Sequence, residues 1–113
     1  MDCLFCKIRD GQIPARLLHE DDRAIAFADI NPQAPLHALV VSRKHIPALL
    51  DLTAEDDALI GHMHRVAANL ARSAGYADEG FRTVFNCGRA AGQSVWHIHL
   101  HVLAGRPLAW PPG

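Results

Sequence analysis

The spacing of apolar residues along the chain predicts one long amphipathic helix and several short strands. Apolar residues recur every three or four positions between Thr53, a good N-terminal capping residue, and Gly75, which favours a helix end. Those core-facing positions are Leu59, Met63, Val66 and Leu70. Shorter apolar runs bounded by turn-forming residues predict five strands, over residues 15–20, 23–29, 37–41, 81–87 and 95–103. With a short helical segment over residues 3–10, the sequence predicts an α+β fold: a five-stranded antiparallel sheet with one long helix and a short N-terminal helix.

The length of the chain sets the number of domains that we expect. A chain of 113 residues is long enough for one compact domain and too short for two ordinary ones, so residues 1–113 are expected to form a single domain. Residues 106–113 contain three prolines, which cannot donate backbone hydrogen bonds. This segment is therefore expected to be an irregular C-terminal tail.

Charge and hydropathy argue against several classes of partner. The formal net charge of −1 gives no electrostatic footprint for nucleic acid or for an anionic membrane. No apolar run reaches the roughly 18 residues needed to span a bilayer, and the first residues lack the basic and apolar regions of a signal peptide. We therefore expect a cytoplasmic protein without a nucleic-acid or membrane partner.

The segment 95–103 separates two kinds of side chain, because side chains alternate between the two faces of a strand. One face carries four apolar residues that are expected to pack against the long helix: Trp96, Ile98, Leu100 and Val102. The other face carries three histidines whose side chains would lie about 6.5–7 Å apart along an open row: His97, His99 and His101.

Three interpretations of this histidine row are open at the level of spacing alone. The row can be a solvated polar face, it can chelate a catalytic transition metal, or it can supply a nucleophile and acid–base groups near neutral pH. The preceding loop, residues 88–94, is rich in small residues that let backbone N–H groups approach an oxyanion, and Ser94 adds a hydroxyl. A phosphate-sized site next to imidazoles favours phosphoryl or nucleotidyl transfer.

Residues 92–103 resemble the signature of the histidine triad (HIT) superfamily, and the resemblance extends along nearly the whole chain. It continues in residues 13–15, in residues 27–35 and in residues 110–113. The match is closest to the histidine triad nucleotide-binding branch, the purine nucleoside phosphoramidases.

The resemblance implies a catalytic role for each of several residues. His99 would attack the α-phosphorus of a nucleotide and form a nucleotidyl-imidazole intermediate, which water then hydrolyses. His101 would contact the phosphate, Ser94 would hydrogen-bond the leaving group or a phosphate oxygen, and His37 would orient the other histidines, although a purely structural histidine fits that position equally well. The backbone of a short segment would complete the anion site: Gly92, Gln93, Ser94 and Val95.

The resemblance also implies where the nucleoside binds. The purine would occupy an apolar slot formed by Leu4, Phe5, Ile8, Phe27 and Ile30. Asp29 would accept hydrogen bonds from the ribose hydroxyls, and Asn86 would lie beside the sugar and phosphate. Phe5, Phe27 and Ile30 fit ordinary core positions equally well, and Asp29 also fits a turn.

A cysteine pair, Cys3-x-x-Cys6, departs from the best-known animal members of this branch. Similarity to bacterial relatives implies a structural zinc ion held by Cys3, Cys6, His45 and His97, with no metal required for catalysis. The alternatives are two reduced cysteines beside a helix or, less well supported, a redox pair. Cys87 is expected to be an ordinary buried thiol.

The expected activity is hydrolysis of purine nucleoside 5′-monophosphoramidates. The alternatives are hydrolysis of dinucleoside polyphosphates, a nucleotide-binding scaffold with vestigial catalysis, and a metalloenzyme with zinc on all three histidines of the row. The resemblance further implies a homodimer in which two sheets join across the interface, with Trp110 of the tail reaching the partner's site.

Overall fold

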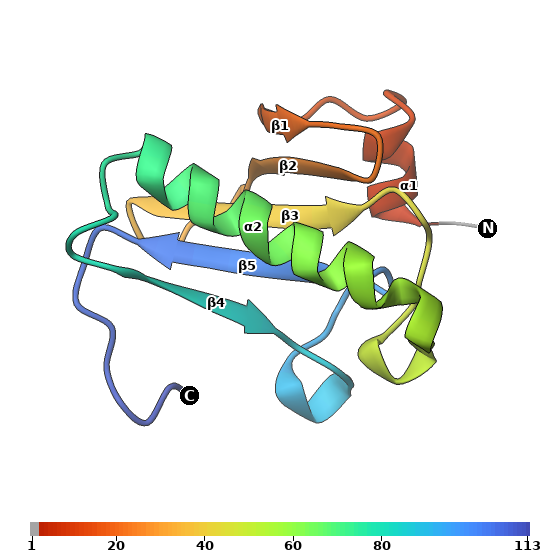
Figure 1. Cartoon of the computed structure of the whole chain (residues 1–113). Coiled ribbons are helices and arrows are strands. Elements are labelled where there is room, and N and C mark those ends of the chain that lie inside the picture. The colour runs from red at the N-terminus through yellow and green to blue at the C-terminus, as the bar shows by residue number, and fades with distance from the viewer. Residues whose placement is uncertain (1–2) are drawn as a thin grey trace.

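Five antiparallel strands form one twisted sheet, and the long helix covers one of its faces (Figure 1). The computed structural model describes residues 3–113. Its helices and strands are α1 (Leu4–Arg9), β1 (Leu17–Glu20), β2 (Ala24–Ala28), β3 (Leu36–Ser42), α2 (Asp57–Ser73), β4 (Phe81–Phe85) and β5 (His99–Ala104). Three short 3₁₀ turns lie at Leu49–Asp51, Ala54–Asp56 and Arg89–Ala91. The strand order is β1-β2-β3-β5-β4, so the predicted α+β fold is confirmed.

The predicted helix stripe packs on the sheet as expected. Met63 and Val66 of α2 are buried in one cluster with Leu100 and Val102 of β5. Leu59 and Leu70 pack against the edge of the same cluster. Burying this stripe, and not the intrinsic helix propensity of α2, holds the helix against the sheet.

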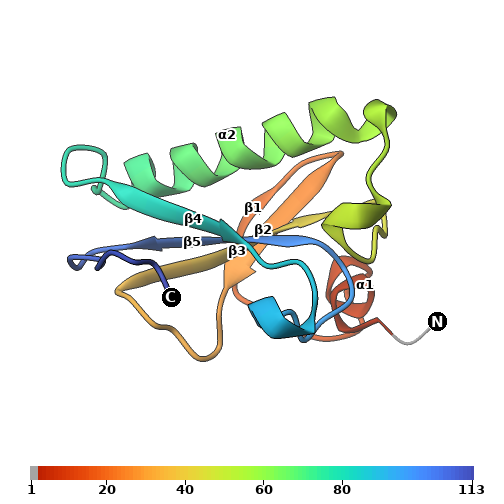
Figure 2. The same cartoon turned by 90° about the horizontal axis from the view of Figure 1, so that it is seen from below.

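On the other face of the sheet, α1 packs near one end (Figure 2). Phe5 of α1 is buried there with Ile25 and Phe27 of β2 and with Leu39 and Val41 of β3. Central strands that are apolar on both faces allow a second small core on this side. The remainder of this face is left for the histidine-bearing side of β5.

The last strand begins later than predicted, at His99 instead of residue 95. Ile98 donates its N–H to the carbonyl of Ile46 (2.8 Å), outside the sheet ladder. Trp96 is 48 % exposed, so the prediction that it shares the buried face was wrong. His97 is completely buried, so the histidines do not form one open row. The predicted alternation of side chains between the two faces of the strand therefore holds from residue 98 onward. It fails before residue 98, because the chain bends to place the His97 side chain between Ser42 and the N-terminal cysteines.

A second group of histidines fixes the turn between β1 and β2. The Asp21 carboxylate bonds to His19 on β1 and to His62 on α2, and it accepts the N–H groups of Arg23 and Ala24. Burial alone would raise the pKa of Asp21, but these hydrogen bonds outweigh it and hold the pKa below its usual value. His19 and His62 therefore connect the edge of the sheet to the long helix.

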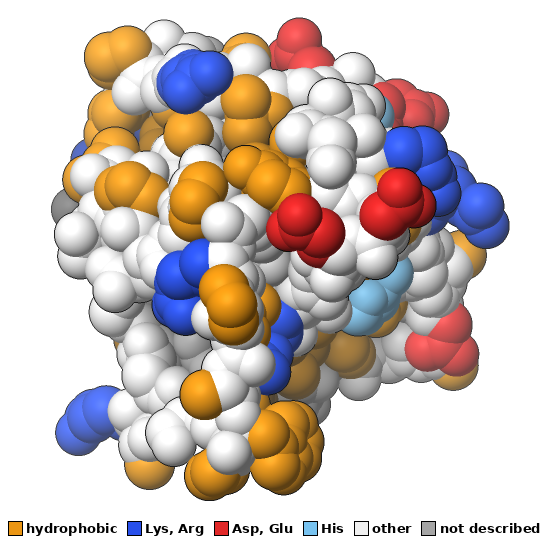
Figure 3. Space-filling model, turned by 90° about the vertical axis from the view of Figure 1, so that its left-hand side faces the viewer, with side chains coloured by type: hydrophobic (Ala, Val, Ile, Leu, Met, Phe, Trp, Pro, Cys, Tyr) orange, Lys and Arg blue, Asp and Glu red, His pale blue; other side chains and the backbone are white. Residues whose placement is uncertain are grey.

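The surface carries no concentration of positive charge on the face that Figure 3 shows, where Lys and Arg side chains lie scattered among acidic and apolar ones. Residues 106–113 form neither helix nor strand. No helix within residues 3–113 is long and apolar enough to cross a membrane.

Candidate functional site

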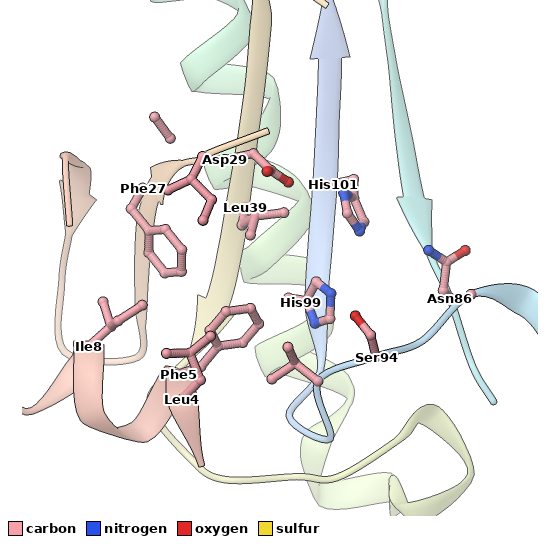
Figure 4. A pocket seen from close by; sticks show the side chains of 14 residues that line it. Leu4, Phe5, Ile8, Phe27, Asp29, Leu39, Asn86, Ser94, His99 and His101 are labelled. Carbon is pink, nitrogen blue, oxygen red and sulfur yellow. The ribbon is translucent and has the colours of Figure 1, made fainter. Parts of the chain in front are cut away.

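A cavity of about 350 Å³ opens on the face of the sheet opposite α2 (Figure 4). It lies between α1, the end of β2, the start of β5 and the loop that follows β4. The structure brings together there most of the residues that the sequence singled out for a nucleotide: Leu4, Phe5, Ile8, Phe27, Asp29, Ile30, Asn86, Gly92, Ser94, Val95, His99 and His101. Ala28 and Leu39 also line the cavity and were not predicted.

One half of the cavity is apolar. The ring of Phe5 meets that of Phe27 edge to face, with centroids 5.5 Å apart, and lies 4.9 Å from the ring of His99. Leu39 lines the same side, and Ile30 is fully exposed at the mouth. Apolar walls with a few polar groups at one end are typical of a site for a flat aromatic ligand.

His99 stands where the apolar and polar halves of the cavity meet. Its Nδ1 lies 2.8 Å from the backbone carbonyl of His97, and a carbonyl can only accept, so Nδ1 carries the proton. The lone pair is therefore on Nε2. Burial lowers the pKa of His99, which keeps the imidazole neutral at neutral pH. A neutral imidazole with a fixed tautomer has the form required of a nucleophile.

His101 and His37 form a hydrogen-bonded pair beside His99. The N–H of Gln33 donates to Nδ1 of His37 (3.0 Å), so the proton of His37 is on Nε2. This Nε2–H donates to Nδ1 of His101 (2.9 Å) and lies 3.3 Å from a carboxylate oxygen of Asp29. His101 must then carry its own proton on Nε2, which makes that nitrogen a hydrogen-bond donor for a ligand.

The loop before β5 is held in shape by Gln93. Its side chain accepts the N–H of Gly88 and donates to the carbonyls of Pro47 and Val95. The Gln93 side chain therefore does not line the cavity; the resemblance implied a contribution to the anion site from the backbone of this residue. The buried amide instead fixes the loop that carries Ser94.

The polar half of the cavity offers hydrogen-bond donors but no Lys or Arg side chain among the described residues. The N–H groups of Gly92 and Gln93 bond to carbonyls within the loop. Those of Ser94 and Val95 have no hydrogen-bond partner among residues 3–113. In Figure 4 the Ser94 hydroxyl lies next to His99, with Asn86 beyond it. No Lys or Arg of the described chain lines the cavity, so an anion bound there would depend on N–H groups, the hydroxyl and imidazole donors.

A separate cluster of atoms that could ligate a metal surrounds Nδ1 of His97, two residues before His99. Nδ1 of His97 is 3.3 Å from Sγ of Cys3, 3.5 Å from Sγ of Cys6 and 3.1 Å from Nδ1 of His45. Sγ of Cys6 is also 3.3 Å from Nδ1 of His45. Four ligands bound tetrahedrally at about 2.0–2.3 Å would lie about 3.3–3.8 Å from one another. The three separations that involve sulfur fall in this range, and the separation of the two imidazole nitrogens, 3.1 Å, is slightly shorter. The four residues therefore form a possible Cys₂His₂ metal-binding group.

The protonation of His97 also suits a metal ligand. Its Nε2 lies 2.6 Å from the carbonyl of Ser42, which places the proton on Nε2 and the lone pair on Nδ1, towards the cluster. Burial lowers the pKa of His97 to about 4, although the bond to Ser42 opposes this shift. Ser42 was not predicted to have any role, because nothing in the sequence marks its carbonyl as the partner of a histidine 55 positions away.

Comparison with known proteins identifies relatives over nearly the full chain. The family model described as "Scavenger mRNA decapping enzyme C-term binding" matches residues 2–107. An uncharacterised HIT-like protein of Synechocystis is 48 % identical over 112 residues, covering 99 % of this chain and 97 % of that protein.

Solved structures give the same result. The crystal structure of a HIT family hydrolase from Legionella pneumophila has a TM-score of 0.97 and 46 % identity, covering 99 % of this chain and all of the other. The crystal structure of a histidine triad nucleotide-binding protein from Candida albicans has a TM-score of 0.81 and 30 % identity, covering 97 % and 83 % of the two chains.

The His37–His101 pair predicts an unusual pH titration. Burial, followed by the neighbouring rings of His99 and His37, lowers the pKa of His101 to about 4, with Asp29 opposing the shift. We expect ¹⁵N NMR to show His101 neutral and protonated on Nε2 at pH 7, with a transition near pH 4. His101→Asn would assign the signal.

The lowered pKa of His101 also determines how the stability of the fold depends on pH. The unfolded chain, with a histidine pKa of about 6.5, takes up this proton first. The stability that neutral His101 contributes is therefore complete above about pH 6.5 and is lost as the pH falls towards 4. A transition of His101 above pH 6 would contradict the lowered pKa, and a proton on Nδ1 at pH 7 would contradict the hydrogen-bond assignment.

Proposed function

Because this chain belongs to the histidine triad superfamily, we propose that it hydrolyses purine nucleoside 5′-monophosphoramidates, with Nε2 of His99 as the nucleophile. The relatives support a hydrolase-type enzyme of this family. The observation that carries the proposal is the unprotonated Nε2 of a buried, neutral His99 at the junction of an apolar slot and a group of hydrogen-bond donors.

The reaction has two displacement steps. In the first, the Nε2 lone pair of His99 forms a bond to the α-phosphorus while the phosphorus–nitrogen bond of the substrate breaks. The bonding pair stays with the leaving nitrogen, which takes up a proton and departs as an amine. In the second, water attacks the phosphorus, the bond to Nε2 breaks, and a nucleoside monophosphate and a proton are released. His99 ends in its starting form, and the sum is addition of one water across the P–N bond.

Each remaining group of the cavity has a role that follows from its geometry. Nε2–H of His101 and the N–H groups of Ser94 and Val95 would donate to phosphate oxygens, which gain negative charge in the transition state. The Ser94 hydroxyl would bond to the leaving nitrogen or to a phosphate oxygen. His37 bonds to His101 and does not line the cavity, so we assign it a positioning role.

The nucleoside would occupy the apolar half of the cavity. The purine would lie between the walls formed by Phe5, Phe27 and Ile8, and Asp29 at the rim would accept hydrogen bonds from the ribose hydroxyls. One Asp29 oxygen already accepts the N–H of Asn31, which holds the carboxylate in place.

We further propose that the Cys₂His₂ group holds a structural zinc ion. Two thiolates and two imidazoles with these separations suit tetrahedral zinc. When bound, the ion would tie the N-terminal residues to the sheet and take no part in the chemistry at phosphorus. With Nδ1 on the metal, His97 would act on catalysis only through its backbone carbonyl.

The proposed homodimer is supported by the edge of the sheet. β4 is an edge strand, and Phe81 at its start is 40 % exposed. An unpaired edge with an exposed aromatic residue can be extended by a second copy of the same strand. Trp110 in the tail is 82 % exposed, as expected of a residue whose contacts lie on a partner.

Replacing the proposed nucleophile tests the function. In His99→Asn, turnover of adenosine 5′-phosphoramidate should fall by about 10³-fold or more, because no other group can form the covalent intermediate. Binding of AMP, measured by calorimetry, should change much less. His64→Asn, an exposed histidine on α2, is the matched control and should keep wild-type turnover. Turnover in His99→Asn equal to that of the wild type would remove His99 as the nucleophile.

The zinc proposal is tested by metal analysis of protein produced with zinc in the medium. The wild type should contain about one zinc per chain, Cys6→Ser should lose it, and Cys87→Ser should retain it. The melting temperature of Cys6→Ser should fall by about 5–10 °C, because α1 loses an anchor to the sheet. A wild-type protein that binds no zinc, with all three cysteines reduced, would contradict the proposal.

A further inference from the structure

A second hollow, of about 570 Å³, adjoins the nucleotide cavity. Leu4, Ser94 and Val95 line both hollows, so the two meet at the residue whose hydroxyl lies beside His99. The rest of the second hollow is lined by Pro47, Trp96 and two members of the metal-binding group, Cys3 and His45. A substrate whose α-phosphate lies at Ser94 can therefore extend past this residue into the second hollow.

Trp96 is the largest apolar side chain that lines this hollow. The chain leaves the sheet before His99, and this turns Trp96 outward until it is 48 % exposed. Single exposed aromatic residues are common on protein surfaces and need no explanation by themselves. Here, however, the indole lines the same hollow as Leu4, Pro47 and Val95, so it forms part of an apolar lining.

We propose that this second hollow binds the leaving group of the substrate and selects amines that carry an uncharged, apolar substituent. The inference rests on the proposed function, because it assigns a binding site to the part of the phosphoramidate that lies beyond the scissile P–N bond. When that bond breaks, the nitrogen keeps the electron pair and takes up a proton. The substituent of the departing amine then lies against Trp96.

The charges of the hollow favour this occupant over a second nucleotide. None of the described residues that line it is Lys, Arg, Asp or Glu, and its polar side chains are Ser94 and the proposed zinc ligands Cys3 and His45, which the metal would occupy. The leaving group of a dinucleoside polyphosphate carries at least one further phosphate, and a bound phosphate requires cationic or multiple N–H partners. An apolar amine requires neither and removes the exposed indole from water.

The test compares three adenosine phosphoramidates that differ only at nitrogen: unsubstituted, N-phenethyl and N-(2-carboxyethyl). We expect the wild type to have a lower KM for the phenethyl than for the carboxyethyl compound. In Trp96→Ala, the ratio of kcat/KM for the phenethyl compound to that for the unsubstituted compound should fall about 5- to 10-fold, mainly through KM. Trp96→Phe should restore most of the ratio, because it keeps an aromatic ring.

Leu50→Ala is the control, since Leu50 is a 91 % exposed apolar residue that does not line the hollow. Its ratio should equal that of the wild type. Thermal melting of Trp96→Ala would show whether it folds, and Trp96→Phe carries the test if it does not. Turnover of all three compounds with ratios independent of residue 96 would overturn the leaving-group site and leave the proposed function standing. Failure of the wild type to hydrolyse any of them would overturn both.

Discussion

The burial of His97 is the constraint on which the rest of the site depends. Its Nε2–H is bonded to the carbonyl of Ser42, its Nδ1 faces the cysteines, and its own carbonyl accepts the Nδ1–H of His99. One residue therefore fixes the path of the chain into β5, the geometry of the metal-binding group and the tautomer of the proposed nucleophile. A metal on Nδ1 would strengthen all three, because it would lock the ring whose backbone orients His99.

The same residue connects the metal-binding group to the nucleotide cavity through α1. This helix has only six residues and would not be stable alone. Cys3 and Cys6 flank Phe5, whose ring lies 6.1 Å from that of His97 and 4.9 Å from that of His99. The contacts that hold α1 against the sheet thus also hold one wall of the apolar half of the cavity. A structural metal and a metal-free reaction are consistent with each other in this arrangement.

The sequence predicted the fold through local periodicity, whereas most of the cavity residues followed from the resemblance to the histidine triad superfamily. The stripe of Met63 and Val66 and the alternation from Ile98 to Val102 were correct. Trp96 and His97 were placed wrongly, because strand alternation says nothing of a bend imposed by contacts with Ser42 and Cys3, far away in the chain. The internal role of the Gln93 amide and the cavity contact of Leu39 likewise depend on tertiary packing.

The proposed reaction places a phosphate in the cavity of a chain whose formal net charge is −1. Neutral imidazoles, a hydroxyl and two free N–H groups replace the Lys and Arg side chains that the described cavity lacks.

Mass spectrometry of the protein quenched during turnover of a slow adenosine phosphoramidate tests this account most directly. The account predicts one added adenosine monophosphate, on the peptide that contains His99 and lost in His99→Asn. An adduct on another residue that persists in His99→Asn would contradict it.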